Sequence, residues 1–308
     1  MNNLAPIALF VHARLDHTKE TIQSLLNNPL AEESTIYIFS DNARLERKDE
    51  ATKVELVRNY INSISGFKSI KIIYRDVNYG LKRNIVEGLN QVLESNNRVI
   101  VIEDDCVTSA NFLEFMNNSL EQYKDNNDVW HISAWNPGVD INGNSFPSYY
   151  MSCWGWATWR DNWKKIRLNP LDLMEEMTFR ARYRFNLNGK YPFYSHLLGN
   201  YLGINNTWAV FWYASIYNSG GYCINSPKSL IKNLGMDGTG SHNTIIFNQD
   251  NNKVSLKPST TSTVTLEDTL IALSNVFKEK QSRYQYVYTL VKMLTPIWVL
   301  KFIKHFKD

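Results

Sequence analysis

The residues with the clearest chemical potential are three adjacent acids, Glu103, Asp104 and Asp105. They directly follow the apolar run Val99–Ile102, which is typical of a strand buried on both faces. Three neighbouring carboxylates repel one another, so a fold that keeps them together commonly compensates them with a cation. Carboxylate oxygens suit Mg²⁺ or Mn²⁺, which can bridge a diphosphate. The triplet indicates a metal–diphosphate site, with a solvated acidic turn as the alternative.

The elements around this triplet must place it at the edge of a sheet. Short apolar runs predict four strands, at Ile7–Val11, Thr35–Ser40, Ser69–Tyr74 and Arg98–Ile102. Amphipathic segments predict helices over 19–27 (with Thr18 as N-cap), 54–64 and 82–94, and from Ser109 onward. This alternation predicts an α/β fold with a mixed, mainly parallel sheet flanked by helices. In such sheets ligands bind beyond the carboxyl ends of strands, near a switch in strand order.

The second half of the chain has a less regular pattern. We expect strands at Val129–Ser133, Ser148–Ser152 and Tyr222–Leu230, and helices over 171–204, Trp208–Asn218 and Thr265–Lys278. Thr265 is the expected N-cap of the last helix, with Asp268 three residues on. The segment Gly235–Gly240 is typical of a flexible loop, and 248–262 of a polar surface connection.

Composition narrows the class of protein. The chain has 308 residues, of which 44% are apolar and 20% charged, so it is neither disordered nor embedded in a membrane. The net charge of +3 hides an asymmetry. Residues 1–150 carry 14 Lys+Arg against 20 Asp+Glu, a net −6, and residues 151–308 a net +9. The two halves are expected to meet different partners.

The same counts exclude several kinds of site and partner. Three cysteines without paired spacing argue against a disulfide scaffold and a cysteine-based zinc site, and fit a reducing cytosol. No signal peptide is expected, and no stretch of 18 apolar residues is present. The acidic first half and a pI of about 8.5 disfavour a nucleic-acid reader.

Seven sequence motifs, taken in order, carry a family resemblance. They are ALFVHARLDHTKETIQSLL, IYIFSDNAR, NYGLKRNIVEGL, VIVIEDDCVTSANFLEFM, SCWGWATWRDNW, NTWAVFWYAS and KNLGMDGTGSH. Over roughly residues 5–245 the chain resembles GT-A-fold glycosyltransferases. It is most similar to bacterial O-antigen- and capsule-type enzymes related to animal N-acetylglucosaminyltransferase I.

The resemblance implies an activity. The chain would be a metal-dependent, inverting hexosyl- or N-acetylhexosaminyltransferase that uses a nucleotide diphosphate sugar, with UDP-sugars favoured. Its acceptor would be a lipid-linked glycan in surface polysaccharide or lipopolysaccharide biosynthesis. Two other readings stay open: a nucleotide-sugar nucleotidyltransferase and a non-catalytic sugar-binding module. A nucleotidyltransferase should have a glycine-rich loop after the first strand, but the chain reads VHARLDHT there, without a glycine.

The resemblance also assigns roles at the metal and the phosphates. Asp105 would hold Mn²⁺ or Mg²⁺, and Asp104 would lie against the ribose of the nucleotide sugar. Arg14 would face the nucleotide and its phosphates, and Lys82 would supply a point charge toward phosphate. A plain surface cation is the alternative for Arg14 and for Lys82.

Further roles concern the nucleotide base and the loop that would close over the diphosphate. Asp41 would accept from the nucleotide base or sugar, or else simply form a turn, and Asn78 would also contact the nucleotide sugar. In GMDGTGSH, Ser241 and backbone N–H groups would close over the diphosphate. His242 would be a second metal ligand, with an ordinary loop histidine as the alternative.

The tryptophan-rich segment is the candidate acceptor or sugar pocket. The resemblance places Trp154, Gly155 and Trp156 there, since flat rings suit sugar C–H bonds and glycine allows close approach. The alternative is a helical core stripe of Trp156, Trp159 and Trp163, which are spaced i, i+3, i+7.

The general base departs from the family pattern. An inverting enzyme needs a carboxylate to deprotonate the acceptor hydroxyl. The family position, just before Trp208, holds Asn206, and an amide cannot act as a base. Asp237 and Asp161 are the candidate replacements, although Asp161 also fits a solvated helix acid.

The C-terminal tail suggests a surface partner. Residues 278–308 carry seven Lys+Arg and two acids, a net +5, among apolar and aromatic side chains, and Pro296 should break a helix there. Such a tail can lie on an anionic bilayer, at the inner face of the cytoplasmic membrane. Packing on the domain or an oligomer contact are the alternatives. We therefore expect a glycosyltransferase domain over 1–245 (nucleotide-sugar half 1–135, acceptor half 136–245) and a linker with amphipathic helices over 246–308.

Overall fold

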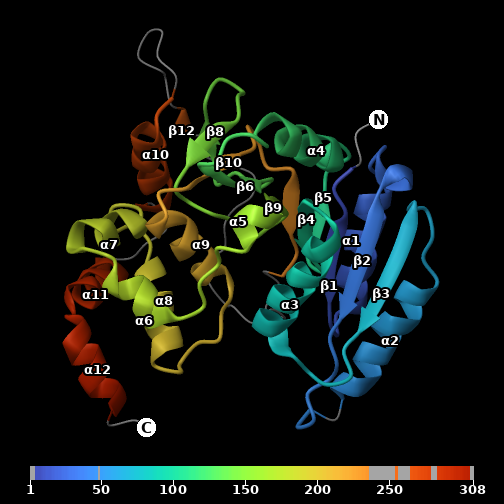
Figure 1. The fold of residues 1–308 in the computed structure, drawn as a ribbon, viewed down its shortest axis with the longest axis horizontal. Helices are drawn as coiled ribbons and strands as arrows, with labels where there is room; N and C mark the ends of the chain where they lie inside the picture. Colours follow the sequence, from blue (N-terminus) through green and yellow to red (C-terminus); the bar gives the residue numbers. More distant parts are fainter. Residues whose placement is uncertain (1–3, 48, 236–253, 256–263, 279–282, 306–308) are drawn as a thin grey trace. The chain divides into compact units, whose positions relative to one another are not determined.

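The computed structural model describes residues 4–47, 49–235, 254–255, 264–278 and 283–305. The described residues form two compact units that alternate along the chain (Figure 1). Unit 1 lies within Met1–Asn136, Ser152–Lys164 and Lys228–Gln249, and unit 2 within Pro137–Met151, Lys165–Pro227 and Asp250–Asp308. The first break, at Asn136, falls beside the expected boundary at 135. The expected acceptor half, in contrast, is divided between the units, and the C-terminal helices share unit 2 with its middle part.

Unit 1 is built on four parallel strands in the order β3-β2-β1-β4. Their bounds are β1 Ile7–Val11, β2 Thr35–Ser40, β3 Ser69–Tyr74 and β4 Arg98–Glu103. Every residue of β1 is buried, as expected for a strand covered on both faces. The first three strands agree with the sequence prediction at both ends, and β4 is one residue longer.

Four short strands complete the sheets of unit 1. Strand β9 (Trp156–Trp159) pairs antiparallel with β4 and with β6 (Val129–Ser133), which extends the main sheet. A separate antiparallel pair joins β5 (Cys106–Thr108) to β11 (Ile231–Asn233). The predicted fold class, a mixed and mainly parallel sheet flanked by helices, is confirmed.

Helices flank this sheet. They are α1 Leu15–Leu26, the 3₁₀ turn η1 Ala31–Glu33, α2 Glu50–Asn62, α3 Gly80–Ser95, α4 Phe112–Gln122 and α5 Arg160–Trp163. Helix α3 packs on β1 and β4, and α4 on β9 and β6. The expected N-cap at Thr18 is wrong, because α1 begins at Leu15 and the Thr18 hydroxyl donates to the Arg14 carbonyl oxygen at 2.8 Å.

The tryptophan-rich segment is the largest difference from the predicted local structure. Trp156 and Trp159 lie in strand β9, and the helix α5 begins only at Arg160. The alternative of a helical core stripe is therefore wrong as to the helix, because pairing with β4 and β6 holds Trp156 and Trp159 extended. Trp156 and Trp163 are nevertheless both buried in the core. Strand β8 (Phe146–Ser148) ends where the predicted strand Ser148–Ser152 was to begin.

Unit 2 is mainly helical. Its helices are α6 Pro170–Glu175, α7 Phe179–Phe185, α8 Phe193–Tyr201, α9 Ala209–Asn218, α10 Leu266–Lys278, α11 Arg283–Leu294 and α12 Ile297–His305. Two short strand pairs accompany them, β8 with β10 (Tyr222–Asn225) and β7 (Val139–Asp140) with β12 (Val254–Ser255). Aromatic rings fill the core of this unit, mostly edge-on to one another, and Phe185 stacks on Tyr213 at 4.3 Å between ring centroids.

The C-terminal helices begin and end at the expected signals. The Thr265 hydroxyl accepts from the Asp268 N–H at 3.2 Å, and the Asp268 carboxylate accepts from the Thr265 N–H at 3.0 Å, which is a capping box. Pro296 separates α11 from α12, as predicted. Helix α11 packs against α7 and α8, and Arg182 Nη1 donates to the Met293 carbonyl oxygen at 3.0 Å. Among the described helices, none is long and apolar enough to cross a bilayer.

Candidate active site

The four parallel strands of unit 1 end at one edge of the sheet, and the strand order switches there. Strands β2 and β3 lie on one side of β1, and β4 lies on the other. Open α/β sheets bind ligands at such a switch point, beyond the carboxyl ends of the strands. Arg14 follows β1, and Asp104 and Asp105 follow β4. The fold therefore brings these three predicted residues to the position where a ligand is expected.

Arg14 binds both aspartates. Its Nη2 donates to Asp104 Oδ1 and, at 2.9 Å, to Asp105 Oδ2, while Nε donates to Asp104 Oδ2 at 3.4 Å. The turn is also held by α1, because the Thr21 hydroxyl donates to the Asp104 carbonyl oxygen at 2.8 Å. This segment therefore does not form the solvated acidic turn. Its aspartates lie in a largely buried cluster in which Arg14 balances their charge.

The electrostatics of the cluster follow from its burial. Burial lowers the pKa of the Arg14 guanidinium, but the charges of Asp104 and Asp105 outweigh it and raise the pKa overall. Asp104 is only 4% exposed. Burial raises the pKa of its carboxyl, and the Arg14 charge limits that rise. The guanidinium thus supplies positive charge beside Asp104 and Asp105.

Strand β11 holds the Asp105 carboxylate from a second side. Asn233 Nδ2 donates to Asp105 Oδ1 at 3.3 Å, and Asn233 Oδ1 accepts from the Gly235 N–H at 2.8 Å. The Leu234 N–H donates to the Asp105 carbonyl oxygen at 2.7 Å. A Cβ at Gly235 would clash with Asp105 Oδ2, so glycine lets the chain pass this close to the carboxylate. Sequence reasoning missed Asn233, because its partner becomes visible only through the β5–β11 pairing.

The donor set at Asp105 fits a hard divalent cation. Mg²⁺ is commonly held by one or two carboxylates together with substrate phosphates and water. Asp105 offers such a carboxylate, with 14% of its side chain exposed. Over the described part of the chain, no group of three or more His, Cys, Asp or Glu side chains is placed to hold a metal. A divalent cation at Asp105 would need further oxygen ligands, such as those of a substrate phosphate or of water.

A second polar cluster joins the end of β2 to the start of α3. The Asp41 carboxylate accepts from the N–H groups of Tyr79 (2.8 Å), Gly80 (2.9 Å) and Asn42 (2.9 Å). Asn78 Nδ2 donates to Asp41 Oδ2 at 3.3 Å and to the Asn42 carbonyl oxygen at 2.5 Å. The structure brings Asp41 and Asn78 together, but the buried Asp41 carboxylate accepts hydrogen bonds from the protein's own donors. Their contact with a nucleotide stays a prediction.

The predicted sugar pocket is only partly open. Trp156 is fully buried, with its ring stacked on His131 at 5.1 Å and tilted against Trp163 at 5.8 Å. The prediction that Trp156 faces a sugar is therefore corrected, because its ring belongs to the core. Trp154 is half-buried, and its ring meets Trp135 edge-on at 4.8 Å.

Gly155 is required by packing within the protein. Its φ is +60°, and a Cβ there would lie 2.6 Å from Ile231 Cγ1. Both the backbone conformation and the contact exclude a larger side chain. The close approach predicted at this glycine is thus made by the chain's own strand β11.

Comparison with known proteins gives the family. Residues 1–170, more than half of the chain, match the model of the GNT-I family. The chain belongs to the GNT-I family. The matched segment contains Arg14, Asp41, the acidic triplet and the tryptophan-rich segment, and the resemblance to GT-A-fold glycosyltransferases is confirmed. No curated protein matches the sequence.

Several solved structures are similar in fold. Residues 1–349 of S. aureus TarS align with a TM-score of 0.41 at 10% identity, over 76% of this chain and 61% of that one. The Pyrobaculum calidifontis mannosyltransferase PcManGT, solved with GDP-Man and Mn²⁺, aligns with a TM-score of 0.40 at 8% identity, over 70% and 68%. This GNT-I family chain thus spans about three fifths of the TarS segment.

The remaining predicted residues lie on other elements or outside the described residues. Lys82 is half-buried in the first turn of α3, and burial lowers its pKa. The Asp161 side chain is 91% exposed and lies 4.0 Å from Lys164 Nζ, as a solvated helix acid does. Asn206 is exposed in unit 2. Three predicted residues, Asp237, Ser241 and His242, lie outside the described residues.

Proposed function

We propose that this chain transfers a sugar from a nucleotide diphosphate sugar to a glycan acceptor. The observation that carries the proposal is the contact of Arg14 with Asp104 and Asp105 at the switch point of the sheet. Asp104 is buried and Asp105 is more exposed. Such a pair of carboxylates suits a ligand that brings both phosphate and a cation. Membership of the GNT-I family supports the same reaction class.

Each residue of the cluster has a distinct part in this proposal. Asp105 would hold Mn²⁺ or Mg²⁺, with His242 as the second ligand predicted from the sequence. When bound, the cation supplies positive charge against the diphosphate leaving group. Arg14 fixes the direction of both carboxylates, and Asn233 fixes Asp105 from the other side. Preorganised groups of this kind do not have to reorganise as charge develops.

The acceptor hydroxyl needs a base if the transfer inverts the anomeric carbon, which we propose from the family resemblance. Asn206 cannot serve. Asp161 is almost fully in water, without the enclosed surroundings in which a catalytic carboxylate is tuned. We therefore favour Asp237, which follows Gly235 by two residues in the sequence.

The finer features of the reaction are also proposals. UDP-sugars are the favoured donors, a lipid-linked glycan of surface polysaccharide biosynthesis the favoured acceptor, and the inner face of the cytoplasmic membrane the favoured place. The basic C-terminal helices support the contact with an anionic membrane, because they combine lysines with exposed apolar side chains.

A donor screen tests the proposal. Thermal melting is recorded with a panel of UDP-, GDP-, dTDP- and CMP-sugars, each with and without Mn²⁺. A true donor raises the melting temperature by mass action, and more so with Mn²⁺. A hit should then release its nucleotide when a glycan acceptor is added. Donor binding without any release would favour a non-catalytic sugar-binding module, and no response to any nucleotide sugar would refute the proposal.

A further inference from the structure

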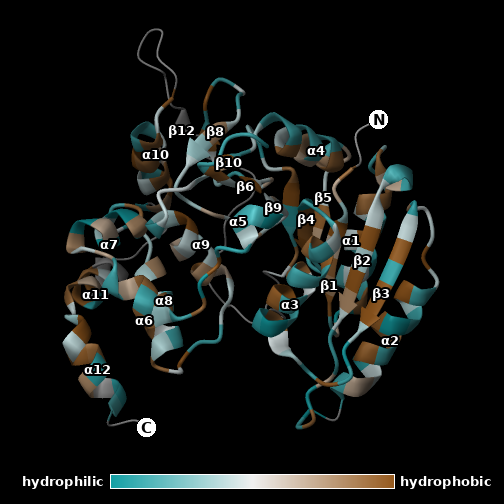
Figure 2. Cartoon of the chain, viewed as in Figure 1, coloured by the Kyte–Doolittle hydropathy of each residue, from teal (hydrophilic) through white to brown (hydrophobic). Residues whose placement is uncertain are grey.

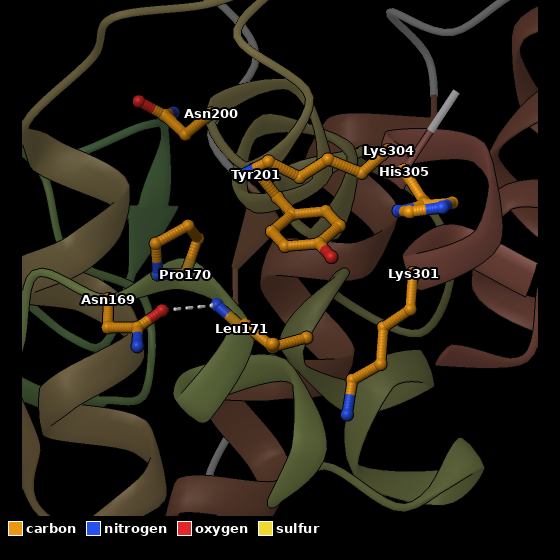
Figure 3. A pocket seen from close by; sticks show the side chains of 8 residues that line it. All are labelled: Asn169, Pro170, Leu171, Asn200, Tyr201, Lys301, Lys304 and His305. Atoms are coloured by element: carbon orange, nitrogen blue, oxygen red, sulfur yellow. Dashed lines mark hydrogen bonds between the residues drawn. The ribbon is translucent and has the colours of Figure 1, made fainter. Parts of the chain in front are cut away.

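A polar pocket of about 560 Å³ opens in unit 2, where the start of α6 and the end of α8 meet α12 (Figure 3). Lys301, Lys304 and His305 of α12 line it, together with Tyr201 and the asparagines 169 and 200. The cluster of Arg14, Asp104 and Asp105 in unit 1 contributes no residue to it. The pocket is therefore a separate feature that glycosyl transfer, as argued above, does not use.

Two lysines give the lining of this pocket positive charge. Among the residues that the structure describes, no acidic side chain lines it. Lys304 Nζ lies 4.6 Å from the centroid of the Tyr201 ring, which holds the ammonium group over an aromatic face. Lys301 Nζ pairs with Glu175, outside the lining, at 2.7 Å, and this hydrogen bond raises the pKa of Lys301. A compact anion such as a phosphate group complements these charges.

Exposed apolar side chains accompany the pocket along α11 and α12. The exposed fractions are 58% for Val287 and Val291, 62% for Leu294 and Phe302, and 71% for Trp298. Spacings of three and four residues place those of each helix on one side of that helix. Figure 2 shows apolar residues alternating with polar ones on both helices.

The buried sides of the same helices face the protein. Met293 of α11 is fully buried and Leu300 of α12 is 2% exposed. The exposed apolar side chains are thus additional to those that pack the helices. Lys301 follows Trp298 by three residues, which is about 60° round the helix. A lysine of the pocket therefore flanks the exposed apolar side of α12.

We infer that the pocket and the apolar side of α11 and α12 together dock on an anionic phospholipid bilayer. The pocket takes the phosphate of a lipid headgroup, and Trp298 and Phe302 enter the boundary between headgroups and acyl chains. Amphipathic helices with basic flanks and tryptophan bind bilayers in this way, without crossing them. The inference rests on the membrane contact in the proposed function, and it names the residues and the lipid group that would make it.

The pocket lysines are tested by vesicle partition of the full chain. Vesicles of phosphatidylcholine with 30% phosphatidylglycerol should bind the wild type, and vesicles of phosphatidylcholine alone should bind it far less. The double variant Lys301→Gln/Lys304→Gln should lose about tenfold or more in partition, because two basic contacts are removed. Lys301→Arg/Lys304→Arg should retain binding, which excludes misfolding as the cause of the loss.

A matched control separates the pocket from net charge. The variant Lys71→Gln/Lys164→Gln removes the same charge from exposed positions of unit 1 and should bind within about twofold of the wild type. Equal losses in both glutamine variants, or no loss at the pocket, would overturn the inference. Inorganic phosphate should release the wild type from vesicles more than chloride at equal ionic strength. Identical effects of the two salts would also overturn it.

The exposed apolar side chains are tested by a separate pair of variants in the same vesicle-partition experiment. Trp298→Ser/Phe302→Ser should lower partition by about tenfold, whereas Leu45→Ser/Leu56→Ser, also at exposed positions, should not. Unchanged partition of the first variant would refute insertion. Donor binding by the wild type without vesicles is measured in parallel. If donors fail to bind while partition still depends on Lys301 and Lys304, the docking surface stands and the proposed transfer fails.

Discussion

At the scale of single residues, the candidate site depends on hydrogen bonds that hold its carboxylates, from Arg14 to Asp105 and from backbone N–H groups to Asp41. Asp104 and Asp105 could be placed beyond the end of a buried strand, and the family resemblance added Arg14 to the site. The contact of Arg14 with both acids was not predicted. The hydrogen bonds that the Asp41 carboxylate accepts within the protein could not be predicted. Their donors are the backbone N–H groups of Tyr79 and Gly80, far along the chain. Asn233 carries no signal of its own until β11 pairs with β5.

Asn233 gives the first prediction. Asn233→Ala should weaken Mn²⁺-dependent donor binding by roughly tenfold, because the Asp105 carboxylate loses the amide that orients it. Isothermal titration of the donor at fixed Mn²⁺ measures this. Lys232→Ala, at the exposed neighbour on the same strand, is the matched control and should bind the donor as the wild type does. Equal affinities for Asn233→Ala and the wild type would show that Asn233 does not position Asp105.

At the scale of elements, buried parallel strands were the most predictable. Their continuous apolar runs have few alternatives, so β1, β2 and β3 agree with prediction at both ends. The segment Trp156–Trp159 was not predictable from spacing, because four residues fit a strand or a helical turn equally. Long-range pairing decides it: Arg98 of β4 lies opposite Trp159.

Gly155 gives a prediction on packing next to β9. Gly155→Ala combines strain at a φ of +60° with a contact of 2.6 Å to Ile231 Cγ1. Gly143→Ala carries similar strain at a φ of +75°, but has no atom within 4 Å of the added Cβ. Gly155→Ala should therefore lower the free energy of unfolding by about 2 kcal/mol more than Gly143→Ala. Denaturant unfolding measures both, and equal losses would contradict the packing at Gly155.

His131 of β6 gives a prediction on pH. It is fully buried against Trp156, and burial lowers its pKa from 6.5 to about 3. Between these values the unfolded chain binds a proton that the folded protein does not. Stability therefore rises with pH across this window and is lost as the pH falls from about 6.5 toward 3, by at most about 1.4 kcal/mol per pH unit.

The His131→Gln variant isolates this effect, because glutamine keeps a donor for the Ser152 carbonyl oxygen but does not titrate. Between pH 6.5 and 5, the unfolding free energy of the variant should fall less steeply than that of the wild type. Parallel slopes for the two proteins would show that His131 is not a neutral, buried residue.

At the scale of the whole molecule, the chain crosses between its units several times. The first crossing lies after Asn136, and composition gives no sign that 152–164 and 228–235 return to unit 1. They return because β9 pairs with β4 and β11 pairs with β5, which are contacts between distant segments. The charge asymmetry is clearer now: acids lie at the switch point of unit 1, and lysines lie on α12 in unit 2.

Hydrogen exchange tests this separation of roles. A nucleotide sugar with Mn²⁺ should slow exchange in the segments after β1 and β4 and in β11, all in unit 1. Anionic vesicles should instead slow exchange in α11 and α12 of unit 2. Protection of the same segments by both ligands would contradict the assignment of one ligand to each unit.

The central claim is that the acids at the switch point serve a nucleotide-sugar transferase. Its most direct test is the release of nucleoside diphosphate from the screened donor, with acceptor and Mn²⁺, by the wild type, Asp105→Asn and Asp161→Asn. Asp105→Asn should lose roughly a hundredfold or more in kcat/KM, because the isosteric amide cannot neutralise a cation. Asp161→Asn should turn over at the rate of the wild type. Undiminished release by Asp105→Asn would contradict the account.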